Sequence, residues 1–67
     1  MRYERIDVEY RLDNSDNDCD YIEDLGTITN ARKECKKLQS KYGTRLEKLE
    51  ILCYNEDGDL ETAIPII

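Results

Sequence analysis

The stretch TITNARKECKKLQSKYG, residues 27–43, decides the fold because its local signals agree on one amphipathic helix. Thr27 can cap free backbone N–H groups at its start, and Gly43 can adopt the left-handed conformation that ends a helix. Between them the apolar residues recur at spacings of three or four, which places them on one stripe. They are Ile28, Ala31, Cys35, Leu38 and Tyr42. The rest of the chain must supply the surface that this stripe covers.

Charge divides the chain into three parts. The net charge of −6 is made of −6 in residues 1–26, +5 in residues 27–48 and −5 in residues 49–67. Basic side chains are therefore confined to the helix and the turn after it, and we expect a protein with two electrically different sides. The lysines near the helix C-terminus also complement the helix macrodipole.

The length of 67 residues allows one small domain, 1–67, which would bury only about 60% of the surface of its unfolded chain. A second copy of the chain is the simplest source of further burial. No apolar run approaches the roughly 20 residues of a membrane-spanning helix, and the N-terminus does not resemble a signal peptide. We therefore expect a cytoplasmic protein.

The cysteines indicate neither a disulfide framework nor a zinc site. They are odd in number and widely spaced, at Cys19, Cys35 and Cys53, and the chain has no histidine. Cys35 lies on the apolar stripe and Cys53 in an expected strand, so both are expected to be buried like small apolar side chains. Cys19 lies between two aspartates, a setting that does not favour a reactive thiolate.

The N-terminal residues 2–12 alternate between apolar and charged side chains, which predicts a half-buried antiparallel strand. Its apolar face carries Ile6, Val8, Tyr10 and Leu12. Its other face, which we expect to be exposed to solvent, carries Arg5, Asp7, Glu9 and Arg11.

Three further strands are expected: a short one at 20–25, one that starts near Glu47 after a bend or bulge, and LETAIPII at 60–67. The turn NEDGD between the last two favours a hairpin, since Asp-Gly tolerates positive φ. Pro65 cannot donate a ladder hydrogen bond, so the last strand should lie at an edge of the sheet.

Residues 13–20, DNSDNDCD, are turn formers and are expected to form an acidic loop. Four oxygen-bearing side chains also match part of a calcium-loop register. They are Asp13, Ser15, Asn17 and Asp24. Asp18 stands where that register needs a glycine, and the flanking segments indicate strands, so a solvated loop is favoured over a cation site.

The element order β-β-α-β-β predicts an α+β fold in which one helix packs on a small antiparallel sheet of three or four strands. If the helix returns the chain to its starting side, the third strand runs antiparallel to the first and can pair with it. The preferred strand order is therefore 2-1-3-4, and the alternative separates pair 1-2 from pair 3-4. The face expected to receive the helix carries Ile6, Val8, Tyr10, Ile51 and Cys53.

No pattern in the sequence indicates catalysis. Histidine is absent, and the chain shows no nucleophile-and-base pair, metal motif or nucleotide-binding loop. We therefore expect a protein that is not an enzyme and has no catalytic, cofactor or metal-binding residues, no small-molecule ligand and no membrane contact. The expected function is that of a small acidic protein-binding or regulatory module, whose partner is an unidentified protein or a second copy of the chain.

The expected interaction surface combines apolar side chains opposite the helix, the C-terminal tail and the acidic loop. Its residues are Leu52, Tyr54, Ile64, Ile66, Ile67, Asp16, Asp18 and Asp20. In size and style the chain resembles many small acidic proteins of bacteria and their phages, which implies no site. One alternative function is a phage- or mobile-element-encoded inhibitor that mimics nucleic-acid charge. A second is nucleic-acid binding through the basic helix, which the acidic flanks oppose.

Overall fold

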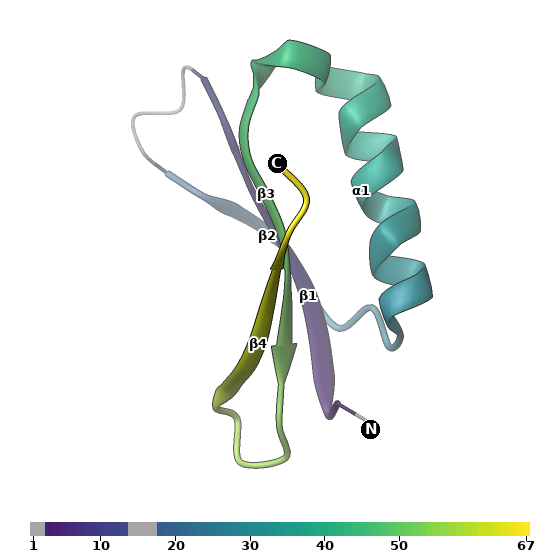
Figure 1. Ribbon diagram of the computed structural model, residues 1–67, viewed down its shortest axis with the longest axis vertical. Helices are drawn as coiled ribbons and strands as arrows, with labels where there is room; N and C mark the ends of the chain where they lie inside the picture. The colour runs from purple at the N-terminus through teal and green to yellow at the C-terminus, as the bar shows by residue number, and fades with distance from the viewer. Residues whose placement is uncertain (1–2, 14–17) are drawn as a thin grey trace.

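Within residues 3–13 and 18–67, which the computed structural model describes, the chain forms a four-stranded antiparallel sheet covered on one face by one α-helix (Figure 1). The elements are β1 (Arg5–Leu12), β2 (Asp20–Ile22), α1 (Ile28–Tyr42), β3 (Leu46–Tyr54) and β4 (Leu60–Pro65). The strand order is β2-β1-β3-β4. This confirms the predicted α+β fold and the preferred order over the arrangement with two separate strand pairs.

The helix begins and ends at its predicted caps. Thr27 Oγ1 accepts a hydrogen bond from the Asn30 N–H at 3.1 Å, which satisfies one of the free donors at the helix start. Gly43 ends the helix with φ of 56°, and its N–H donates to the Gln39 carbonyl. A single 3₁₀ turn, Gly43–Arg45, then leads directly into β3.

The core lies between α1 and the sheet face predicted to receive it. The helix contributes Ala31, Cys35 and Leu38, all of which are buried. The full cluster is Ile6, Val8, Ala31, Cys35, Leu38, Leu46, Leu49, Ile51 and Cys53. At the C-terminal end of the helix, the rings of Tyr10 and Tyr42 stack with centroids 6.2 Å apart and extend this contact to β1.

A β-bulge accounts for the irregular apolar spacing before β3. Arg11 pairs with Lys48, whereas Leu12 pairs with Leu46, so Glu47 is the extra residue on β3. The extra residue brings Leu46 back to the core side, where it is 6% exposed. The predicted bend is therefore confirmed, and the strand begins at Leu46.

The second strand is shorter than predicted, since it ends at Ile22 instead of residue 25. Asp24 has a positive φ of 59°, which breaks the extended conformation. The backbone stays attached to β1 beyond this point, because the Leu25 N–H donates to the Ile6 carbonyl at 2.8 Å.

The predicted hairpin joins β3 to β4, and its turn is held by one side chain. Asn55 Oδ1 accepts hydrogen bonds from the N–H groups of Asp57 and Asp59, both at 3.0 Å. Gly58 adopts the positive φ of 83° that the turn requires. Strand β4, which contains Pro65, lies at an edge of the sheet as predicted.

Gly43→Ala is expected to lower the free energy of unfolding by about 1–3 kcal/mol, because an L-residue is strained at this backbone conformation. An added Cβ would meet no atom within 4 Å, so the loss comes from the backbone and not from a clash. Urea denaturation measures it, with Ser40→Ala on the exposed side of α1 as the control. Equal stability of Gly43→Ala and the unsubstituted protein would contradict the proposed role of Gly43.

Candidate functional site

The sheet face opposite α1 carries charged side chains from β1 and β3 and is called the ion-pair face below. Its residues are Arg5, Asp7, Glu9, Arg11, Glu47, Lys48 and Glu50. The register places Glu9 directly opposite Glu50, a like-charge pair that is destabilising unless a cation lies between them. Lys48 supplies that cation: its Nζ is 2.6 Å from Glu9 Oε1 and 3.3 Å from Glu50 Oε1.

The expectation that the charged face of β1 is exposed to solvent is wrong for its two carboxylates. Asp7 is 2% exposed and Glu9 is 8% exposed. Asp7 Oδ1 accepts a hydrogen bond from the Asp24 N–H at 3.0 Å, and its Oδ2 lies 3.2 Å from Arg5 Nη2. Burial of this carboxylate is tolerated because both oxygens have partners. The backbone turn that ends β2 thus supplies one of those partners.

The contacts of Glu9 change the titration of three groups. The hydrogen bond from Lys48 is the main cause that lowers the pKa of Glu9, and a hydrogen bond from the hydroxyl of Tyr21 adds to it. The same hydrogen bonds raise the pKa of Lys48 and the pKa of Tyr21. Tyr21 stands opposite Glu9 in the β1–β2 register, so a side chain from each of three strands meets at this carboxylate.

Two residues of the expected interaction surface, Leu52 and Tyr54, lie on strand β3 among the ion-pair face residues. The exposure expected for Leu52 is wrong, because it is only 6% exposed between Asp7 on β1 and Ala63 on β4. Tyr54 is half-buried, and the Arg5 guanidinium carbon lies 4.6 Å from its ring centroid. These two side chains therefore do not form an open apolar patch.

The tail residues of the expected surface follow the sheet instead of projecting from it. Ile64 and Ile66 are half-buried and pack against the core, whereas Ile67 is 58% exposed. The N–H groups of Ile66 and Ile67 both donate to the Leu49 carbonyl, at 2.9 and 3.3 Å. Of the three isoleucines, Ile67 is thus the one available to a partner.

The acidic members of the expected surface are apart from the apolar ones. Asp18 and Asp20 are exposed near the start of β2, and Asp16 lies outside the described residues, as do Ser15 and Asn17 of the calcium register. Across residues 3–13 and 18–67 there is no group of three or more side chains that could hold a metal ion.

The positions of the three cysteines agree with those predicted from the sequence. Cys35 and Cys53 are buried, and burial raises the pKa of both thiols. Cys19 is half-exposed near the start of β2. The two buried thiols are therefore part of the core.

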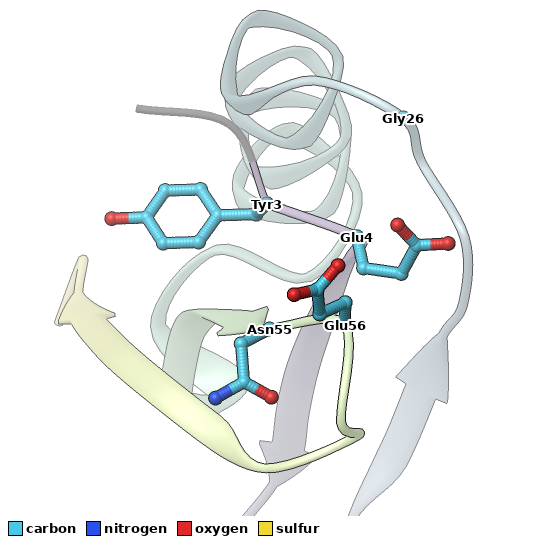
Figure 2. A pocket seen from close by; sticks show the side chains of 5 residues that line it. All are labelled: Tyr3, Glu4, Gly26, Asn55 and Glu56. Atoms are coloured by element: carbon cyan, nitrogen blue, oxygen red, sulfur yellow. The ribbon is translucent and has the colours of Figure 1, made fainter.

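A polar hollow of about 640 Å³ lies where the N-terminal segment meets the β3–β4 turn. It is lined by Tyr3, Glu4, Gly26, Asn55 and Glu56. Figure 2 shows the carboxylates of Glu4 and Glu56 on one side, while the ring of Tyr3 points the other way. The amide of Asn55 is engaged within the hairpin, where its Nδ2 donates to Glu61 Oε2 at 3.1 Å. The hollow is thus an open acidic surface, and the groups that line it do not form a nucleophile-and-base pair.

The exposed side of α1 carries five cations: Arg32, Lys33, Lys36, Lys37 and Lys41. Lys37 forms an ion pair with Glu34 of the same helix, at 3.3 Å. Lys41 Nζ lies 5.1 Å from the ring centroid of the adjacent Tyr42. Within the described parts of the chain, none of the five forms an ion pair with a residue outside α1. This helix surface differs from the sheet, where Arg5, Arg11 and Lys48 all pair with carboxylates.

A small groove of about 130 Å³ separates α1 from the C-terminal tail. Its lining is Arg32, Cys35, Lys36, Gln39 and Ile66. The groove therefore combines apolar contact from the core and the tail with two cations at its margin.

Comparisons with protein-family models, with curated proteins and with solved structures each find no match for this chain. No helix in the part of the chain that the structure describes is long and apolar enough to cross a membrane.

Asp7→Ala is expected to lower the free energy of unfolding by about 1–3 kcal/mol, because it leaves the Asp24 N–H without its acceptor and removes the partner of Arg5. Asp7→Asn keeps an acceptor oxygen and should lose less. Chemical denaturation of the three proteins at neutral pH measures both differences. If Asp7→Ala were as stable as the unsubstituted protein, the carboxylate would not hold the end of β2.

The Glu9–Lys48 contact is expected to make the free energy of unfolding depend on pH in the acidic range. The pKa of Glu9 is lower in the folded protein than its ordinary value of 4.5, so the contribution is complete above that value and is lost as the pH falls through the folded pKa. Lys48→Met should therefore be destabilising at pH 7, with a difference that shrinks at lower pH. Lys33→Met, which removes a lysine without a carboxylate partner in the described chain, is the matched control. A pH-independent loss for Lys48→Met would count against this assignment.

Proposed function

We propose that the protein is a non-enzymatic protein-binding module that presents the outer side of α1 to an acidic partner protein. The observation that carries the proposal is the contrast in charge pairing: the sheet uses its cations to neutralise its own carboxylates, whereas the helix cations make no ion pair outside α1 in the described chain. Cations without an ion-pair partner outside their own helix are available for electrostatic recognition of an oppositely charged surface.

The side of α1 that points away from the sheet is defined by helical geometry. With 3.6 residues per turn, Lys33 and Lys37 lie roughly opposite the buried residues Cys35 and Leu38. Contact with this side would leave the core and the sheet unchanged. Rigid docking on a preformed helix surface also avoids the entropy cost of ordering a flexible segment.

The distribution of acidic side chains supports a protein partner over a nucleic acid. Exposed carboxylates lie at both ends of the sheet, including Asp18 and Asp20 near one end and Glu56 and Asp57 in the turn at the other. A phosphate backbone that continues past α1, which is about 22 Å long by its rise per residue, would approach these charges. A compact acidic patch on a folded partner can contact the helix alone.

Mimicry of nucleic-acid charge has less support from the geometry. It would require carboxylates arrayed toward solvent on the sheet, but Asp7 and Glu9 are buried and paired with cations. The chain contains no histidine, which supports the non-enzymatic part of the proposal.

Affinity capture from nuclease-treated lysate of the source organism tests the proposed function. Lys33→Gln combined with Lys37→Gln should weaken the captured complex about tenfold, equivalent to about 1.4 kcal/mol. Thr44→Glu combined with Arg45→Gln changes the net charge by the same amount outside α1 and should retain the partner. Capture of the partner that is unaffected by the helix substitutions would contradict the proposal. So would a parallel capture from untreated lysate in which the protein retains only nucleic acid.

A further inference from the structure

Strand β4 is an edge strand with an exposed apolar side chain at each end. Leu60, its first residue, is 53% exposed, and Ile67, just beyond its last residue, is 58% exposed. One other large apolar residue in the described chain, Tyr21, is exposed to a similar degree, on β2 at the far edge. Exposed apolar groups along an open strand edge are typical of a surface that pairs with another strand.

The backbone of β4 also has hydrogen-bonding groups that face away from β3. Ile66 N–H donates to the Leu49 carbonyl, so Pro65 and Glu50 form a non-hydrogen-bonded pair and the ring nitrogen of Pro65 points outward. Because backbone direction alternates along a strand, Ala63 likewise directs its N–H and carbonyl away from β3. The missing N–H of Pro65 therefore does not remove a hydrogen bond from the β3–β4 ladder. Ala63 has a hydrogen-bond donor and an acceptor at the free edge of β4.

The two ends of β4 have opposite charge around them. Three exposed carboxylates, Asp57, Asp59 and Glu61, surround its start. Its end continues into Ile66, which lines the groove together with Arg32 and Lys36 of α1. Figure 1 shows the tail turning from β4 toward the helix side of the sheet, while the β3–β4 turn lies at the opposite end.

We propose that two copies of the chain associate by antiparallel pairing of β4 with β4 about a two-fold axis. This arrangement places the start of each β4 beside the end of the other, so that Leu60 of one copy meets the tail of the second copy and each acidic turn lies near the groove cations. The two acidic turns stay apart, at opposite ends of the interface. The sheet continues across the axis, and both helices lie on the same face.

This association is independent of the proposed binding of an acidic partner. It uses the flank of α1 beside the tail, where Arg32 and Lys36 lie, and leaves the outer side with Lys33 and Lys37 free. One copy can therefore pair through β4 while its helix contacts another protein.

Sedimentation equilibrium of the full chain over a range of concentrations tests the pairing. We expect a reversible monomer–dimer equilibrium. Ala63→Pro removes the outward N–H without affecting the β3–β4 ladder and should weaken dimerisation roughly tenfold or more, whereas Ala63→Ser keeps the N–H and should dimerise normally. Amide NMR spectra report whether each variant is folded. A monomer at every concentration, or an unaffected dimer of folded Ala63→Pro, would overturn the proposal.

A charge exchange tests the orientation while leaving the backbone N–H groups of β4 in place. Arg32→Glu with Lys36→Glu should weaken the dimer, as should Asp59→Lys with Glu61→Lys, and combining the four substitutions should restore it. Failure of the combined variant to recover would overturn the antiparallel orientation. Lys33→Gln with Lys37→Gln should leave the dimer intact, so loss of partner capture and loss of dimerisation are measured separately.

Discussion

The constraint on which this structure depends is that one helix can cover only one face of a sheet. The central strands β1 and β3 therefore have a covered face, which forms the core, and a second face that the sheet must close with its own side chains. It does so with charged groups: Lys48 lies between Glu9 and Glu50, and Asp7 lies between Arg5 and the backbone of Asp24. The same face also buries Leu52, which is 6% exposed.

Closure of the second face determines which charges are left for other molecules. Cations on the sheet form ion pairs with neighbouring carboxylates. This face therefore presents little net charge and little exposed apolar area to other molecules. The helix pairs its charges only within itself in the described chain, and its length holds the lysines apart in a fixed array. The acidic excess is displaced to the turns at the ends of the sheet. The basic and acidic segments of the sequence thus form separate surfaces of the folded protein. The basic surface of the helix is the best defined of them.

Much of the fold follows from local sequence signals. The caps Thr27 and Gly43, the alternation in β1 and the placement of Pro65 each depend on a few adjacent residues, so helix bounds, faces and strand order were predictable. The burial of Asp7 was not, because it depends on a positive φ at Asp24, seventeen positions away. For the candidate site, alternation placed Leu52 on the correct side of β3 but could not show that it is buried there, between Asp7 on β1 and Ala63 on β4. Pairing of Lys48 with Glu9 could have been suspected once the β1–β3 register was assumed.

The central position of β1 also has a kinetic consequence. Its long partner in the described sheet is β3, and their register joins Arg5 to Tyr54, so pairing along most of β1 must wait until β3 is made, whereas the short strand β2 can pair with β1 earlier. The helix and the β3–β4 hairpin have only local contacts to form and can appear earlier. Such a high share of distant contacts slows folding relative to a helical bundle of equal size. During synthesis, the edge of β1 that pairs with β3 therefore stays open, and the regularly spaced charges of β1 help to keep it from aggregating until β3 emerges.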